Sequence, residues 1–305
     1  MAKIQSKKPE KNIKTPPVHT HMHNEQTSFV GENIKFTLTI PWAIVQKGYQ
    51  KTLQTFIQIV EIKGFRKGKA PAKLVEEKVG KTKIYEETVS LVLSPAYTEV
   101  IQKKNYKPIT EPHIHPTSMD ENKDWVFEVE IAEYPEVKLG GYLDIIKAVK
   151  AKNAIWTPGK DEKKAEERTE DQKLREIFHA LLEKITIRVP ELLIREEVNH
   201  SLSRLLQQLD RLHVTLDDYL KSVQKTADQL RQDFAVNGLT TLQIEFILTE
   251  IAKDQKLEVS EKEIDEVIAA IPDENVRKAN QTSRQRALIA STLLRQKTVE
   301  WLLKA

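Results

Sequence analysis

Apolar and polar residues alternate, and then recur at helical spacing, along the first ordered stretch of the chain. The segment "IKFTLTI" (34–40) alternates strictly and is rich in β-branched residues, which predicts a half-buried strand that ends at Pro41. Beyond Pro41, apolar residues follow at steps of three and four, at Trp42, Val45, Tyr49, Leu53, Phe56 and Val60. This spacing predicts an amphipathic helix, in which Gly48 is unfavourable because glycine has a low helix propensity. The helix should end near Lys63, because Gly64 is a typical helix terminator.

Shorter patterns continue up to about residue 135. Pro71 opens a short helix, "PAKLVEEKVG", that ends at Gly80, and the apolar positions from 81 to 104 predict a longer one. The stretches "KPITEPHIHP" and "DWVFEVEIAEYP" read as two strands of a hairpin around "TSMDENKD". The first half is therefore predicted to be a small α+β domain with an antiparallel sheet.

The second half has a helical pattern throughout. From residue 139 we expect a strand and then a polar connector, and from Asp171 to Ala305 only helices. The clearest stripe steps by four and three residues, at Val198, Leu202, Leu205, Leu209 and Leu212. Further helical patterns cover about 215–236, 239–256, 260–271 and 283–303.

These patterns divide the chain into four parts and make it mostly helical overall. We expect residues 1–27 to be a basic, largely flexible extension and residues 28–150 to form the α+β N-terminal domain. Residues 151–170 are a charged linker, and residues 171–305 form an all-α C-terminal domain.

Composition narrows the function classes. The 305-residue chain is long enough for two ordinary domains, and 30% of its residues are charged. No apolar run is long enough to cross a bilayer, and the N-terminus does not resemble a secretory signal, so we expect a cytoplasmic protein with no membrane partner. The absence of cysteine excludes disulfides, thiolate catalysis and cysteine-ligated zinc.

The basic charge gathers around one loop. The net charge is only +3, but residues 41–83 hold 10 Lys and Arg against 3 Asp and Glu. Their centre is "IKGFRKGKAP" (62–71), where Phe65 stands among cations at the end of a helical hairpin. An exposed aromatic flanked by Arg66, Lys67 and Lys69 can stack on a base or fill an apolar crevice while the cations meet phosphates or carboxylates. The alternative is an ordinary solvated turn, and the residues alone favour the two about equally.

The sequence "GFRKGKAP" resembles the signature loop of bacterial trigger factors, the ribosome-associated chaperones. The likeness extends to "TLTIPWAIVQKGYQKTLQTFIQIVEIKGFRKGKAPAKLVEEKVG", "AYTEVIQKKNYKPITEP" and "WVFEVEIAEYPEVKLGGYLDI" of that family's N-terminal domain. The stretch "ITIRVPELLIREEVNHSLSRLLQQLDRLHVTLDDYLKSVQKT" resembles the start of its helical C-terminal domain.

The resemblance implies an ATP-independent chaperone that needs no cofactor and docks beside the exit tunnel of the large ribosomal subunit, on ribosomal protein and rRNA. The loop Gly64, Phe65, Arg66, Lys67, Gly68 and Lys69 would make this contact. The helical domain would hold nascent and unfolded polypeptides through small exposed apolar patches. We expect Leu206, Phe246, Trp301 and Leu302 to line such patches, since they stand beside the main apolar stripes. Whether the free protein forms a homodimer through the same surfaces stays open.

The chain departs from the family between the two domains. Trigger factors normally carry a prolyl isomerase domain there, whereas "LDIIKAVKAKNAIWTPGKDEKKAEERTEDQ" joins the domains in a few dozen residues. We therefore expect no enzyme activity. Two other classes stay open: a prolyl isomerase of divergent type, and a ribosome or RNA-binding assembly factor without chaperone activity.

Histidines raise the question of a metal site. His19, His21 and His23 would share one face of a strand, and so would His113 and His115. No carboxylate or cysteine completes a familiar ligand spacing, so polar edge-strand residues are the favoured reading and no metal is predicted. The sequence also has no phosphate-binding glycine loop and no recognisable catalytic nucleophile.

Overall fold

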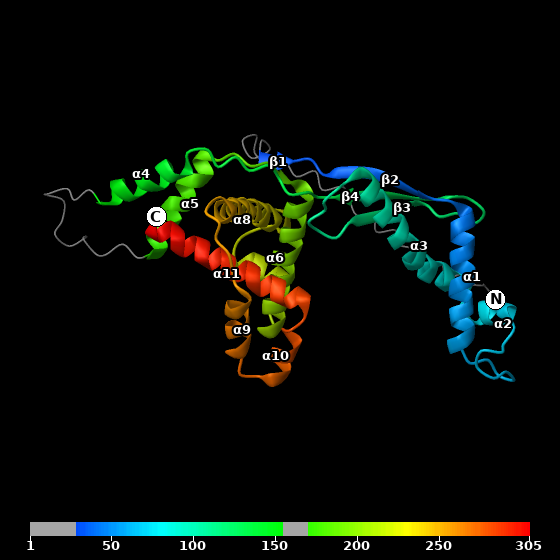
Figure 1. The fold of residues 1–305 in the computed structure, drawn as a ribbon. Helices are drawn as coiled ribbons and strands as arrows, with labels where there is room; N and C mark the ends of the chain where they lie inside the picture. Colours follow the sequence, from blue (N-terminus) through cyan, green and yellow to red (C-terminus); the bar gives the residue numbers. More distant parts are fainter. Residues whose placement is uncertain (1–28, 155–169) are drawn as a thin grey trace, which may run out of the picture.

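The computed structural model describes residues 29–154 and 170–305, and its shape is extended (Figure 1). It has two hydrophobic cores. We call residues 34–131 the head, and residues 132–154 and 170–305 the helical body. The cores adjoin in sequence at Ile131 and Ala132, well before the predicted domain boundary at residue 150. Phe29 and Val30, although N-terminal to the head, pack on the core of the body.

The head is a three-stranded antiparallel sheet covered by helices, as the alternating pattern predicted. Its strands are β2 (Ile34–Ile40), β3 (His113–Ser118) and β4 (Trp125–Ile131), in the order β2-β4-β3. Its helices are α1 (Trp42–Ile59), α2 (Ala72–Val79) and α3 (Lys81–Lys104). The apolar face of the sheet buries Leu38, Ile40 and Phe127. The predicted strand, short helices and hairpin are thus confirmed.

Helix α1 ends four residues earlier than predicted. Val60 already has an extended backbone, with φ −83° and ψ 130°. The amide of Gly68 donates to the carbonyl of Ile57 at 3.1 Å, so the following loop supplies one of the hydrogen bonds that the end of the helix lacks. Gly64 serves a turn of that loop instead of the end of the helix.

Gly48 allows α1 to lie close against α3. The buried face of α1 consists of Val45, Gly48 and Thr52, and the larger aromatic residues flank it. A Cβ atom at Gly48 would lie 2.5 Å from Cγ1 of Val92 and 3.1 Å from Cγ2 of Thr88. The glycine that local propensity marks as a defect is therefore a packing requirement.

Substitution of Gly48 by valine should separate these two helices. We expect the free energy of unfolding to fall by about 1–3 kcal/mol, because overpacking a close helix contact forces side chains and backbone to shift. Urea unfolding followed by circular dichroism measures the change. Gln50→Val places the same side chain on an exposed position of α1 and should cost much less; equal losses would show that β-branching alone, and not the α1–α3 contact, is responsible.

The helical body consists of one long helix surrounded by others. The long helix is α8 (Ala227–Asp254), and the core around it comes from α4 (Tyr142–Ala154), α5 (Glu170–Lys184), α6 (Glu191–Arg211) and α11 (Ser283–Lys304). The remaining elements are the parallel strand pair β1 (Val30–Gly31) and β5 (Val189–Pro190), and α7 (Leu216–Ser222), α9 (Glu261–Ala269) and α10 (Glu274–Ala279).

Two predictions for the second half were wrong. The strand expected from residue 139 is the helix α4, whose Tyr142 and Ile146 are buried in the body core. The helices predicted over 215–236 and 239–256 are redivided, because Thr226 forms a capping box with Gln229 and starts α8 there. Gly238 does not break α8, since it packs closely against Glu197, 3.1 Å from where its Cβ would lie.

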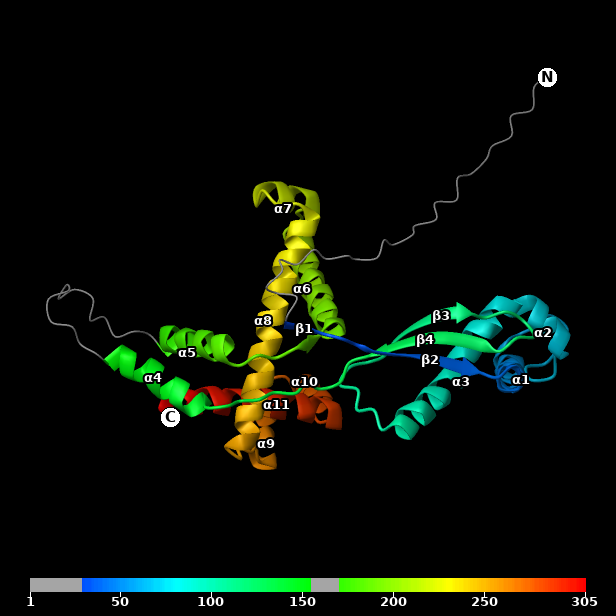
Figure 2. The same ribbon diagram turned by 90° about the horizontal axis from the view of Figure 1, so that it is seen from above.

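Three parts project from the molecule. The leg, formed by α1, α2 and the loop between them, extends from the head, and the arm of α9 and α10 extends from the body in roughly the same direction (Figure 1). The turned view shows a third projection, where α7 joins the ends of α6 and α8 (Figure 2). The fold thus presents three separate tips on one frame.

Candidate functional site

The tip loop, residues 60–71, joins α1 to α2 and lies at the far end of the leg (Figure 1). Two short turns give it shape: the Phe65 amide donates to the Ile62 carbonyl and the Lys69 amide to the Arg66 carbonyl, both at 3.0 Å. Gly64 and Gly68 have φ of 88° and 78°, values that glycine adopts without steric cost. The predicted turns are thus present, and the loop has a defined structure.

Both ends of the tip loop are held by the head. Ala70 is buried beside the start of α2, and Val75 of that helix is completely buried. The Tyr49 hydroxyl of α1 donates to Oε1 of Glu76 in α2 at 2.7 Å. Burial and this hydrogen bond to a carboxylate raise the pKa of Tyr49. The leg therefore presents the loop on two helices that are tied together.

Phe65 is the apolar centre of the tip loop. Its side chain is 43% exposed, which is unusual for a large aromatic residue. It borders a shallow, open hollow whose other lining residues are Glu61, Ile62, Lys63, Lys67 and Lys78. An apolar ring at the edge of a cationic hollow suits a partner that is both anionic and partly apolar.

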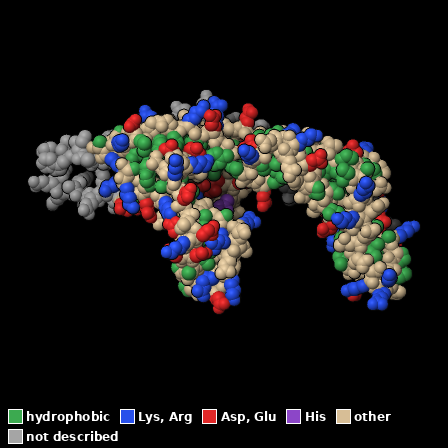
Figure 3. All heavy atoms as spheres, viewed as in Figure 1, with side chains coloured by type: hydrophobic (Ala, Val, Ile, Leu, Met, Phe, Trp, Pro, Cys, Tyr) green, Lys and Arg blue, Asp and Glu red, His purple; other side chains and the backbone are tan. Residues whose placement is uncertain are grey.

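The charges of the tip loop are only partly neutralised. Lys67 pairs with Glu61 at 2.9 Å, and this hydrogen bond and charge lower the pKa of the Glu61 carboxyl. Arg66 and Lys69 are exposed, and among the described residues neither makes an ion pair. Lys and Arg side chains gather at the end of the leg (Figure 3). The structure thus brings together Phe65, Arg66 and Lys67 on one small exposed loop.

The predicted client-binding residues are scattered, and two of them are not accessible. Phe246 is 8% exposed and Leu302 fully buried, both within the body core, so their expected exposure was wrong. Sequence alone could not show which of two adjacent apolar residues faces the core. Trp301 is half-buried against that core, whereas Leu206 is 43% exposed on α6.

An apolar surface that the sequence did not reveal surrounds the α7 projection. Leu212 was expected to continue the core stripe of its helix, but it is 70% exposed where α6 ends. Val214 and Val223, on either side of α7, are also exposed. With Leu206 they give this tip an apolar character, which we call the α7 tip.

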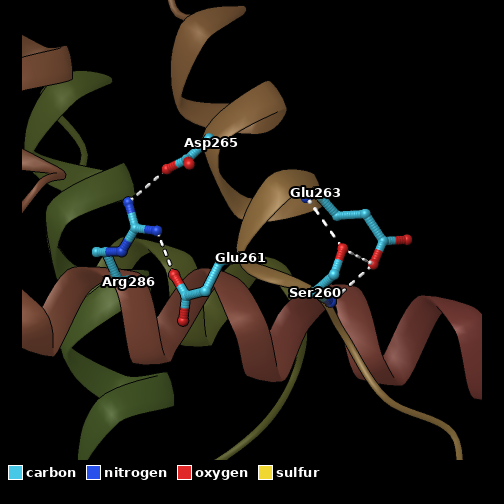
Figure 4. Close-up of polar contacts among 5 residues, drawn as sticks. All are labelled: Ser260, Glu261, Glu263, Asp265 and Arg286. Atoms are coloured by element: carbon cyan, nitrogen blue, oxygen red, sulfur yellow. Dashed lines mark hydrogen bonds and ion pairs between the residues drawn. The ribbon is translucent and has the colours of Figure 1, made fainter.

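Helix α9 of the arm is fixed to α11 by ion pairs (Figure 4). Arg286 of α11 reaches two carboxylates of α9, pairing with Asp265 at 2.7 Å and with Glu261. Ser260 and Glu263 form a capping box at the start of α9. A contact from Lys297 at 2.6 Å and hydrogen bonds from Ser260 lower the pKa of Glu263 to about 2. The arm is thus joined to the body by several ion pairs between α9 and α11.

The structure adds little to the question of a metal site. His113 and His115 share one face of β3, and Nε2 of His113 lies 3.3 Å from Oε1 of Glu196. Within residues 29–154 and 170–305, no three histidine or acidic side chains converge as metal ligands would. His19, His21 and His23 lie outside the described residues.

None of the helices that the structure describes combines the length and the hydropathy of a membrane span.

Comparison with family models places the whole fold among known proteins. Residues 22–168 match "Bacterial trigger factor protein (TF)", and residues 159–304 match "Bacterial trigger factor protein (TF) C-terminus". The two ranges overlap, so no residues of this chain lie between them.

Individual relatives agree with the family models. The trigger factors of Staphylococcus aureus strains JH9 and Newman are each 33% identical over 106 residues, which are 35% of this chain and 24% of the relative. The chain thus matches about a quarter of the length of these curated relatives.

A solved structure shares the fold. It is described as "Promiscuous Substrate Recognition in Folding and Assembly Activities of the Trigger Factor Chaperone", with a TM-score of 0.55 and 13% identity. The match covers 90% of this chain and 97% of the other. With both family models matched in order across residues 22–304 and the fold shared, the chain belongs to the trigger factor family.

Proposed function

We propose that this protein is a ribosome-associated, ATP-independent chaperone that binds nascent or unfolded polypeptides. The observation that carries the proposal is the exposed tip loop, in which Phe65 lies among Arg66 and Lys67 at the far end of the leg. A cationic loop with an apolar centre matches a surface made of rRNA phosphates and ribosomal protein. Membership of the trigger factor family supports the partner that we propose, the large ribosomal subunit near its exit tunnel in the cytoplasm.

Each part of the tip loop has a distinct role in this proposal. Arg66, Lys67 and Lys69 supply charge pairing to phosphates or carboxylates, and Phe65 fills an apolar crevice. Lys67 must exchange Glu61 for its new partner, whereas Arg66 makes no ion pair within the described chain and binds without such an exchange. Gly64 and Gly68 keep the turns that present these side chains.

Polypeptide binding is assigned to exposed apolar residues of the body. Leu206, Leu212, Val214 and Val223 form the α7 tip, and they replace Phe246 and Leu302, which the core buries. Small apolar patches give weak contacts to many sequences, and weak contacts dissociate fast, so release needs no nucleotide. A homodimer of the free protein through the same patches would compete with clients.

Co-sedimentation with purified ribosomal subunits tests the docking. We expect binding to the 50S and not to the 30S subunit, and weaker binding as salt rises from about 50 to 200 mM, since cation–phosphate contacts release counterions. Binding to both subunits alike would indicate non-specific attraction to RNA. A protein that binds the large subunit but leaves aggregation of an unfolded model protein unchanged would favour the assembly-factor alternative.

The isomerase alternative has a direct test. The two family matches overlap and leave no residues for the domain that carries this activity in the family. We therefore expect no acceleration of X-Pro isomerisation in a protease-coupled peptide assay, where the uncatalysed step takes tens of seconds or more. A rate above the no-protein control that scales with protein concentration would contradict this.

A further inference from the structure

The head and the body are joined by polar contacts rather than by a shared hydrophobic core. The head core draws its residues from positions 34–131, and the body core from positions 29–30 and from 132 onward. Two neighbouring chain segments connect them, because β2 and β4, which lead into the two connections, are paired side by side with Ile34 opposite Ile131. In both ribbon views these connections form a narrow stem (Figures 1 and 2).

A carboxylate at the end of the stem gathers contacts from both sides. Glu130 of β4 has a side chain that is only 10% exposed and accepts a hydrogen bond from Nδ2 of Asn33 at 2.9 Å. Nζ of Lys35, on the neighbouring strand β2, lies 3.3 Å from Oε1 of Glu130. Arg195, from helix α6 of the body, donates a charged hydrogen bond to Oε2 of Glu130. Of these three donors, only Arg195 comes from the body.

Burial alone would raise the pKa of Glu130. The hydrogen bonds from Asn33 and Arg195 and the positive charge of Arg195 outweigh it, and the pKa lies below its ordinary value. The carboxylate is therefore ionised at neutral pH and holds Arg195 by charge as well as by hydrogen bonding.

Two neighbouring contacts extend the same connection. The other end of the Asn33 amide, Oδ1, accepts from the backbone amide of Leu192 at 2.8 Å and so satisfies a free donor in the first turn of α6. His113, directly opposite Glu130 on β3, lies 3.3 Å from Glu196 of α6. The first turns of one body helix thus meet the end of the head sheet at several polar points.

We propose that the stem is a hinge, and that Glu130 with Arg195 is a latch that sets the angle between head and body. Polar contacts at a narrow two-segment connection have discrete made and broken states, which is typical of a hinge. When the latch is closed, the leg and the α9–α10 arm are held at one separation. When it opens, the head turns on the stem and the separation between the leg and the arm changes.

Spin labels can measure this angle directly. The chain has no cysteine, so Lys73→Cys on the leg and Arg284→Cys beside the arm give two unique sites, both exposed. In pulsed electron–electron double resonance we expect one narrow peak for the distance between the two labels when the latch is intact. Glu130→Gln should add a displaced population of about 10% or more, because the neutral amide no longer holds Arg195 by charge.

A second variant and a matched control complete the test. Arg195→Gln removes the latch from the body side without altering the head core, and should give the same displaced population. The double variant should give no more than either single one, since both remove one contact. Glu136→Gln, at an exposed ion pair with Lys138 in the segment between β4 and α4, should leave the peak unchanged. An unchanged peak in both Glu130→Gln and Arg195→Gln, with normal circular dichroism, would overturn the latch.

Discussion

Replacing Phe65, Arg66 and Lys67 together by alanine should weaken binding to the large ribosomal subunit by about 100-fold or more. A buried aromatic anchor typically contributes about 2 kcal/mol or more to an interface, and every 1.4 kcal/mol is a factor of about ten. The two lost cations should also reduce the salt dependence, by roughly one unit of slope for each phosphate contact. Co-sedimentation at low and moderate salt measures both effects, with circular dichroism as the check on folding.

The matched control removes the same charge from the same leg. Ile44, Lys47 and Lys51 lie on exposed positions of α1, and their triple alanine variant also loses one apolar side chain and two cations. We expect it to bind nearly as well as the unmodified protein. Equal weakening of both variants would mean that the overall charge of the leg attracts the ribosome. If the tip-loop variant bound normally, the docking role of the loop would be refuted and the helical body would be better studied as a free chaperone.

Substitution of Leu302 by alanine should destabilise the body by about 2–5 kcal/mol, the usual cost of removing a buried leucine side chain. Leu302 is fully buried in the core that α11 shares with α8, where its neighbours cannot close the cavity completely. Urea unfolding monitored by helical circular dichroism gives the change in the free energy of unfolding. A loss of this size would show that Leu302 stabilises the fold and is not part of an exposed surface that binds polypeptides.

Leu206 provides the matching exposed leucine. Its side chain is 43% exposed on α6, so Leu206→Ala should change the free energy of unfolding by less than about 0.5 kcal/mol. The same variant should weaken aggregation suppression, more so in combination with Leu212→Ala, because both belong to the α7 tip. Similar stability losses for Leu206→Ala and Leu302→Ala would contradict the burial that separates them. Full aggregation suppression by the double variant would remove the α7 tip from the client surface.

Local chemistry was enough to predict much of the head and the shape of its functional loop. Alternation predicted β2 and the β3–β4 hairpin, and Pro71 and Gly80 delimited α2. The turns at Gly64 and Gly68 also follow from nearby residues, because glycine adopts positive φ without steric cost. For the same reason the exposure of Phe65 was predictable: a tight loop at the end of a helical hairpin has no core within reach.

Contacts with residues distant in sequence determined features of the fold that local sequence patterns did not predict. Helix α4 exists where a strand was expected, because the body core receives Tyr142 and Ile146. Gly48 is required by Val92, about 40 residues away in sequence, and Gly238 stays helical against Glu197 of another helix.

Contacts between segments distant in sequence also decide which residues of the helical half are buried. The same kind of contact joins the head to the body. Helical spacing shows that a stripe of apolar residues will be covered, but only the neighbouring helices decide which side of the stripe they cover. Phe246 and Leu302 are therefore buried while Leu206 and Leu212 stay exposed. The Glu130–Arg195 contact between head and body was equally invisible, since ion pairing depends on distance in space and the two residues are far apart in sequence. The sequence by itself determined the tip loop and the family, whereas the tertiary structure decided which apolar side chains solvent can reach, because burial depends on contacts between segments that local residue patterns do not specify.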